Sequence, residues 1–276
     1  MLKRLRAVLG AAHLGPSVLV ALVSVALGVV SGLEGWRVAV LGGVILFNQL
    51  SVGWSNDAID SGRDAEDARA DKPIARGDVS ARGILNLAVV TAIVSIALSL
   101  LLGRAFAIAH LVGLAAGWAY NLGLKRTLAS TACYLVFFGS IPLLVTLARE
   151  EPRPAVWWAI TMGGMLGLAA HFANVLPDLE DDKRHGINSL PHRMGVRPAG
   201  LVALLALAVV GVLGVLGPAQ LTPVTVIGGC ATLVLLIAGI VVIVRAPASR
   251  ALFRIIMLAA LAAVVTLAGA AGSIVA

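Results

Sequence analysis

Two acid-rich segments of this sequence carry the residue types most able to perform chemistry. Both have the spacing Asn-x3-Asp-x3-Asp with one further acid: Asn56, Asp57, Asp60 and Asp64 in the first, and Asn174, Asp178, Asp181 and Asp182 in the second. In an α-helix each residue is rotated by about 100° from the one before it, so the side chains of each set project into an arc of roughly 100° on one side of the helix. Carboxylate and amide oxygens are hard ligands that suit Mg²⁺ and leave room for phosphate oxygens. The pattern predicts a site for Mg²⁺ and a diphosphate.

The two segments match at a constant offset of 118 residues. The match extends past the acids, because Pro73 aligns with Pro191 and Gly77 aligns with Gly195. Such self-similarity indicates an internal duplication. A single acidic run beside an apolar segment is usually a solvated loop, whereas two arrays in register favour a functional site.

Basic residues accompany both segments. Tyr120 comes shortly before Lys125 and Arg126. These two residues could reach a diphosphate, Lys125 through its compact ammonium charge and Arg126 through its planar guanidinium group. Lys72 and Arg76 follow the first acid set, where they could equally serve only to orient the chain in a membrane. The sequence leaves both interpretations open.

His171 lies three residues before Asn174 and therefore near the same helical face. It could bind an acceptor or accept a proton, or it could be a polar residue buried in a helix bundle. Cys133 and Cys230 stand alone in apolar runs, without the CxxC spacing of a metal or redox site. Both are expected to be packing residues.

The elements that must position these residues are membrane-spanning helices. Of the 276 residues, 59% are hydrophobic and 13% charged, whereas soluble domains carry about 25% charged residues. Apolar runs of spanning length lie near 14–33, 37–55, 83–102, 105–123, 128–147, 155–176, 198–216, 221–244 and 252–275. Continuous runs exclude the alternating pattern of a membrane barrel. The sequence predicts an all-α, polytopic integral membrane protein of about nine transmembrane helices, forming a single domain over 1–276.

The distribution of charge predicts the topology. With nine spans, 17 of the 21 basic residues fall on the side of the N-terminus and four on the other side. Positively charged loops normally remain in the cytoplasm. We therefore expect a multi-pass protein of the cell membrane with a cytoplasmic N-terminus. The acid-rich segments, near 56–78 and 174–195, then lie on the cytoplasmic side.

Several other classes of protein fit less well. The net charge of +7 could suggest nucleic-acid binding, but too little polar surface remains for it. A cation transporter should carry acids near the middle of the membrane, whereas these lie at predicted helix ends. A CDP-alcohol phosphotransferase would need an Asp-Gly-x2-Ala-Arg signature, which residues 64–69 do not supply.

Residues 56–77, 174–195 and 120–126 resemble the signature segments of the UbiA superfamily of intramembrane prenyltransferases. The resemblance extends over essentially the whole chain. It implies a helical bundle around a central cavity and two Mg²⁺ ions bridging the diphosphate of an isoprenyl substrate. It also implies attack on the resulting allylic cation by an acceptor.

Carried over position by position, the resemblance implies catalytic roles for Asp60, Asp64, Asp178 and Asp182. It implies that the diphosphate is bound by Asn56, Asn174, Lys72, Arg76, Tyr120, Lys125 and Arg126. It leaves open whether Asp181 or Asp182 is the main ligand.

The function expected from these features is Mg²⁺-dependent prenyl transfer. The enzyme would ionise an isoprenyl diphosphate and transfer the prenyl group to a small aromatic or lipidic acceptor within the bilayer. The residues argue directly for ionisation of the diphosphate, whereas the separate acceptor follows from the resemblance. A terpene cyclase on the same scaffold, in which the cation meets its own double bond, remains an alternative.

Overall fold

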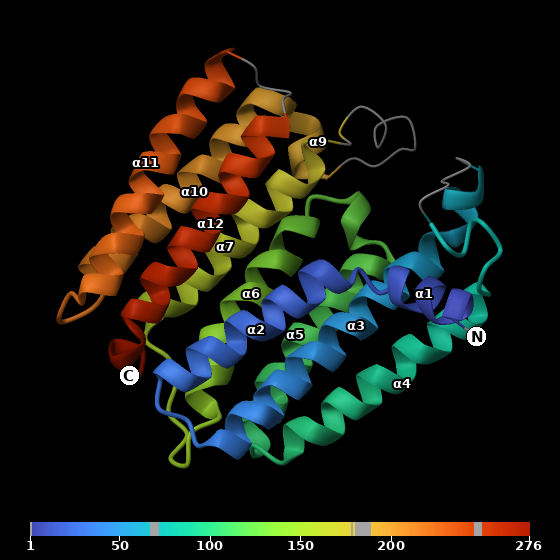
Figure 1. Ribbon diagram of the computed structural model, residues 1–276, viewed down its shortest axis with the longest axis horizontal. Coiled ribbons are helices and arrows are strands. Elements are labelled where there is room, and N and C mark those ends of the chain that lie inside the picture. Colours follow the sequence, from blue (N-terminus) through green and yellow to red (C-terminus); the bar gives the residue numbers. More distant parts are fainter. Residues whose placement is uncertain (1, 67–71, 178, 180–188, 246–249) are drawn as a thin grey trace.

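The computed structural model of the protein describes residues 2–66, 72–177, 179, 189–245 and 250–276, and the regular elements in these ranges are helices (Figure 1). The N-terminal half contains α1 (Leu2–Gly10), α2 (Leu14–Val30), α3 (Gly35–Glu66), α4 (Ala81–Leu100), α5 (Arg104–Leu122), η1 (Leu124–Arg126) and α6 (Ser130–Leu147). The C-terminal half contains α7 (Trp157–Val175), α9 (Leu190–Met194), α10 (Val196–Leu216), α11 (Pro223–Arg245), α12 (Arg250–Gly269) and η2 (Ala271–Ser273).

Each of the nine apolar runs contains a long helix in the described part of the chain. Seven of these helices are individually long and apolar enough to cross a membrane: α3, α4, α5, α6, α10, α11 and α12. An eighth span is possible if α1 and α2, which meet at a bend of 62°, are taken together. The expectation of an all-helical membrane protein is confirmed, while the count of nine spans stays a prediction.

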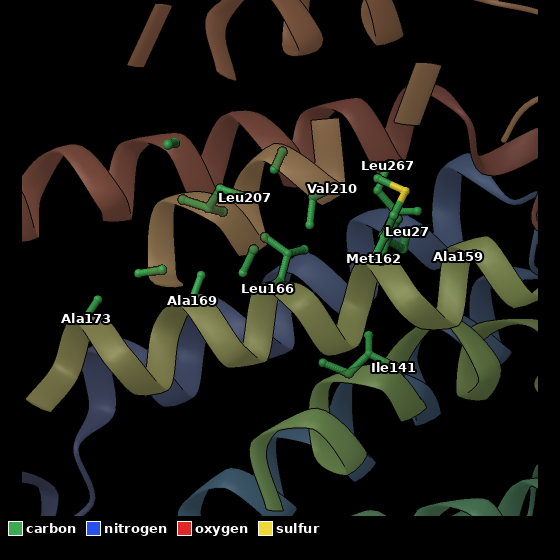
Figure 2. Packing of buried hydrophobic residues seen from close by; sticks show 14 of the residues in the cluster. Leu27, Ile141, Ala159, Met162, Leu166, Ala169, Ala173, Leu207, Val210 and Leu267 are labelled. Carbon is green, nitrogen blue, oxygen red and sulfur yellow. The ribbon is translucent and has the colours of Figure 1, made fainter. Parts of the chain in front are cut away.

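α7 differs from the other long helices because it lies at the centre of the bundle. It packs against α6, α10 and α12. Figure 2 shows its buried face, on which Met162, Leu166 and Ala169 lie among side chains of neighbouring helices. A helix enclosed by protein does not need a lipid-compatible surface. This explains why α7 can carry polar residues such as His171.

Small residues bring α6 and α7 close together. A Cβ atom at Gly163 would lie 2.5 Å from the carbonyl oxygen of Phe138, and one at Gly167 would lie 2.5 Å from that of Tyr134. Glycines four residues apart are a common device for close packing of membrane helices. The contact places Tyr134 of α6 beside His171 of α7, with ring centroids 4.6 Å apart.

The predicted duplication has a counterpart in the turns that follow the signature helices. Gly77, before α4, and Gly195, before α10, adopt positive φ angles of 77° and 85°. Pro73 and Pro191 each accept a backbone hydrogen bond in these turns. α4 then packs against α3, as α10 packs against α7.

Candidate active site

The first acid-rich segment forms the last turns of α3. This helix runs for 32 residues, well beyond its apolar part, and ends at Glu66. Asp57, Asp60 and Asp64 are buried, with only 2%, 6% and 4% of their surface exposed. The expected carboxylate-bearing helix end is therefore present. Because buried charges must be paired or bound to metal, their partners are informative.

Lys125 is the main partner of Asp60. α5 ends at Leu122, and the short η1 helix turns Lys125 back towards α3. Its Nζ donates to Asp60 Oδ1 and Oδ2 at 2.5 and 2.6 Å and to Asn56 Oδ1 at 3.2 Å. Burial lowers the pKa of the Lys125 ammonium, and the adjacent Asp60 carboxylate opposes this shift. The structure thus joins two segments that the sequence presented separately.

Asp57 is held by a different pair of residues. Lys72 Nζ donates to Asp57 Oδ1 at 2.6 Å, and His13 Nε2 lies 2.8 Å from the same oxygen. His13 is the only non-glycine residue with positive φ in the described part of the chain. A left-handed backbone is unfavourable for such a residue and persists only where the surroundings fix it.

The surroundings of His13 do fix it. A Cβ atom at Gly53 of α3 would lie 2.6 Å from the carbonyl oxygen of Ala12, so only glycine admits the corner between α1 and α2 here. Trp54 Nε1 donates to the carbonyl oxygen of Val8 at 2.8 Å. These contacts place His13 at the end of α3 that carries the acids. No sequence pattern predicts this contact, because it joins Asp57 to a corner of the chain 44 residues away.

A cavity of about 500 Å³ opens beside these residues. His13, Asn56, Tyr120 and Asn174 contribute polar groups to its lining. The rest of the wall is largely apolar and comes from α2, α6 and α12, including Val23, Phe137, Phe138, Ile141, Leu261 and Val264. The cavity therefore combines a polar end with a long apolar wall, which suits a substrate with a charged head and a hydrocarbon tail.

An aromatic cluster lies at the polar end of the cavity. The Tyr134 ring stacks on His171 and meets the edge of Tyr120 at 5.3 Å between centroids. Asn174 lines the same cavity as Tyr134 and Tyr120. His171 is 1% exposed and its Nε2 lies 3.1 Å from Ser130 Oγ, so it is a buried residue of the bundle. The sequence singled out Tyr120 and His171 but missed Tyr134, which connects them.

The other predicted site residues are less closely grouped. Arg76 pairs with Asp78 at 2.8 Å, and Arg126 is exposed. Asp178, Asp181 and Asp182 lie outside the described residues, and their roles remain predictions.

The residues present fit the predicted magnesium ion. Asp60 and Asp64 are buried at the same end of α3, and Arg63 Nη2 lies 4.0 Å from Asp64 Oδ1, which is a long ion pair. The carboxylate oxygens of Asp60 and Asp64 and the amide oxygen of Asn56, which lies beside Lys125, are hard ligands of the kind that Mg²⁺ prefers. Within the described ranges, no three acid, histidine or cysteine side chains form a complete metal site. The first segment would thus supply only part of the coordination.

The fold and this site define a helical membrane protein with an apolar cavity, and His13 and Asn56 at its polar end lie next to the buried ion pairs of Asp57 and Asp60. The sequence matches the UbiA prenyltransferase family over residues 14–262, so this chain belongs to that family. It is similar to the bacteriochlorophyll synthase 33 kDa chain of Cereibacter sphaeroides, with 28% identity over 190 residues. That match covers 65% of this chain and 62% of the relative, which is less than two thirds of the relative's length.

Solved structures show the same fold. A UbiA homologue from Aeropyrum pernix in its apo form has a TM-score of 0.75 at 16% identity, covering 92% of this chain and 96% of that chain. A UbiA homologue from Archaeoglobus fulgidus bound to DMAPP and Mg²⁺ has a TM-score of 0.69 at 15% identity, covering 97% and 99%. The expected family and fold are confirmed.

Proposed function

We propose that this protein is a Mg²⁺-dependent prenyltransferase that ionises an isoprenyl diphosphate and transfers the prenyl group to a small aromatic or lipidic acceptor. The observation that carries the proposal is the buried Lys125–Asp60 pair, whose lysine also donates to Asn56 at the polar end of an apolar cavity. The Archaeoglobus homologue with bound DMAPP and Mg²⁺ supports the same class of substrate.

The proposed reaction breaks the bond between the allylic C1 and the diphosphate oxygen. The electron pair leaves with the diphosphate, the acceptor then forms a bond to C1, and the acceptor loses a proton. Mg²⁺ held by Asp60 and Asp64, with Asn56 and the second acid-rich segment, would neutralise charge on the departing diphosphate. We expect two such ions and a site on the cytoplasmic side of the cell membrane.

Residues of this chain have distinct parts in the proposal. Lys125 can donate to a diphosphate beside Asn56, because its ammonium already lies within hydrogen-bond distance of that amide. Lys72 is held near the same helix end by Asp57. The apolar wall excludes water, which would otherwise capture the allylic cation.

The test is an assay of purified protein with Mg²⁺ and isoprenyl diphosphates of several lengths, with and without acceptors. Products are identified by mass spectrometry. We expect acceptor-dependent prenylated products from the wild type and loss of diphosphate release in Asp60→Ala. Glu66→Ala is the matched control, since it removes an exposed carboxylate from the same helix end.

Two results would contradict the proposal. Diphosphate release that persists in Asp60→Ala would exclude the described carboxylates from the site. Hydrocarbon or alcohol products formed equally well without any acceptor would instead identify a cyclase.

A further inference from the structure

One polar side chain in the cavity has no role in the site described above. Gln49 of α3 lines the cavity on the same helix face as Val52, Gly53 and Asn56. Among the described residues, no hydrogen bond to its side-chain amide occurs. Two neighbouring polar side chains face other helices and have partners there: Asn48 Nδ2 lies 3.1 Å from His110 Nε2, although Asn48 Oδ1 has no partner, and Ser51 donates to the carbonyl oxygen of Ala88 at 2.7 Å.

The position of Gln49 separates it from the diphosphate. It precedes Asn56 by seven residues, which is two helical turns or about 10 Å along the axis on the same face. The reacting C1 must lie beside the diphosphate at the polar end. Gln49 therefore faces a part of a substrate beyond the reacting carbon, or the acceptor.

A prenyl tail is a poor partner for this amide. Covering a polar group with hydrocarbon removes water without supplying a hydrogen bond, which is unfavourable. The wall formed by α2, α6 and α12 offers side chains such as Val23, Phe137 and Val264 for the tail. The cavity thus separates into an apolar side for the tail and an α3 side with one unpaired amide.

The charge of the lining indicates what binds this amide. Among the described residues that line the cavity there is no Lys or Arg. The one basic side chain in this described part of the lining is His13, which lies at the polar end and is held by Asp57. A carboxylate placed beside Gln49 would be a buried charge without a cationic partner, which is strongly unfavourable.

We propose that Gln49 binds a neutral hydroxyl or carbonyl group of the acceptor, so that the acceptor side of the cavity selects uncharged oxygen functions over carboxylates. This inference rests on the proposed function, since it concerns the second substrate of the same site.

The experiment compares the wild type with Gln49→Met, which keeps the length of the side chain but removes the amide. Gln220→Met is the matched control, because Gln220 is exposed in the connection between α10 and α11. The donor is geranyl diphosphate with Mg²⁺. The acceptor probes are 1,4-dihydroxybenzene, farnesol and 4-hydroxybenzoate, the last of which replaces a hydroxyl with a carboxylate.

Turnover and binding are measured separately. We expect Gln49→Met to raise KM for the neutral probes about fivefold to tenfold, the loss expected for one neutral hydrogen bond. KM for geranyl diphosphate should stay within about twofold of the wild type. Saturation-transfer NMR without any donor should show the neutral probes bound to the wild type and to Gln220→Met, and more weakly to Gln49→Met.

Four results would overturn the inference, the first three of which concern the variant and the choice of probe. These are an unchanged acceptor KM in Gln49→Met, a change confined to the KM of geranyl diphosphate, or binding of 4-hydroxybenzoate in preference to the neutral probes. A lack of binding by every probe would also overturn it. If the wild type releases no diphosphate, the proposed function fails, and the NMR comparison still reports on Gln49 by itself.

Discussion

The contact between Lys125 and Asp60 makes a prediction that separates a structural ion pair from a metal site. Lys125→Met removes the ammonium and keeps the length of the side chain. Lys125 and Asp60 have side chains only 8% and 6% exposed, so solvent cannot replace the lost partner. Breaking a buried pair in this way costs ~3–5 kcal/mol, against ~0–1 kcal/mol for an exposed pair.

We expect the loss of folding stability in Lys125→Met to lie at the lower end of that range. Arg63 Nη2 remains 3.2 Å from Asp60 Oδ2 and compensates part of the charge. We therefore expect a loss of about 3 kcal/mol without Mg²⁺. For a chain of this size, that corresponds to a fall in the unfolding midpoint of roughly 6–12 °C.

Magnesium should reverse much of this loss. A divalent ion bound at Asp60 replaces the missing positive charge, and a ligand that binds only the folded state stabilises it. We expect Mg²⁺ to raise the midpoint of Lys125→Met by more than it raises that of the wild type. The assay is thermal unfolding in detergent micelles, followed by tryptophan fluorescence with Mg²⁺ or with EDTA.

The matched control is Arg126→Met, which removes the exposed neighbouring cation. Its effect should stay within about 0.5 kcal/mol, as for most surface substitutions. Equal losses in Lys125→Met and Arg126→Met would refute the buried pair. A loss in Lys125→Met that Mg²⁺ does not reduce would refute metal binding at Asp60.

Three further predictions follow from the corner between α1 and α2 and from the metal site. Gly53→Ala should lower stability by ~1–3 kcal/mol, seen as a lower unfolding midpoint, because the new methyl group would meet the backbone of Ala12. His13→Asn should raise KM for the diphosphate about tenfold, because the hydrogen bond to the Asp57 carboxylate is lost. Asparagine is chosen because it tolerates a left-handed backbone. Removal of Mg²⁺ with EDTA should abolish diphosphate release, measured by phosphate detection after pyrophosphatase treatment.

Each of these predictions has its own control. Gly62→Ala lies on the same helix in open space, so it should leave the midpoint unchanged or slightly higher. A midpoint in Gly53→Ala equal to that of Gly62→Ala would disprove the close approach. For His13→Asn, an unchanged KM with a lower unfolding midpoint would indicate a purely structural role. Activity that persists in EDTA and is insensitive to added Mg²⁺ would remove the metal from the proposal.

The sequence by itself determined the class of the protein and the placement of four polar residues at one helix end. Every membrane-spanning segment must be apolar along most of its length and must pair its backbone groups internally, so the helices can be recognised from the hydropathy of the sequence alone. The acids of the first segment follow helical periodicity within one element, and this local spacing correctly predicted that Asn56, Asp57, Asp60 and Asp64 share the end of α3.

Only the tertiary structure showed which residues meet these acids. Lys125 reaches Asp60 across 65 positions of sequence, and His13 reaches Asp57 across 44. Such pairings depend on the turn of η1 and on the space that Gly53 leaves for a distant corner. Periodicity describes one helix and carries no information about its neighbours. The same limit applies to Gln49, whose cavity-facing amide is apparent only once the surrounding helices are in place.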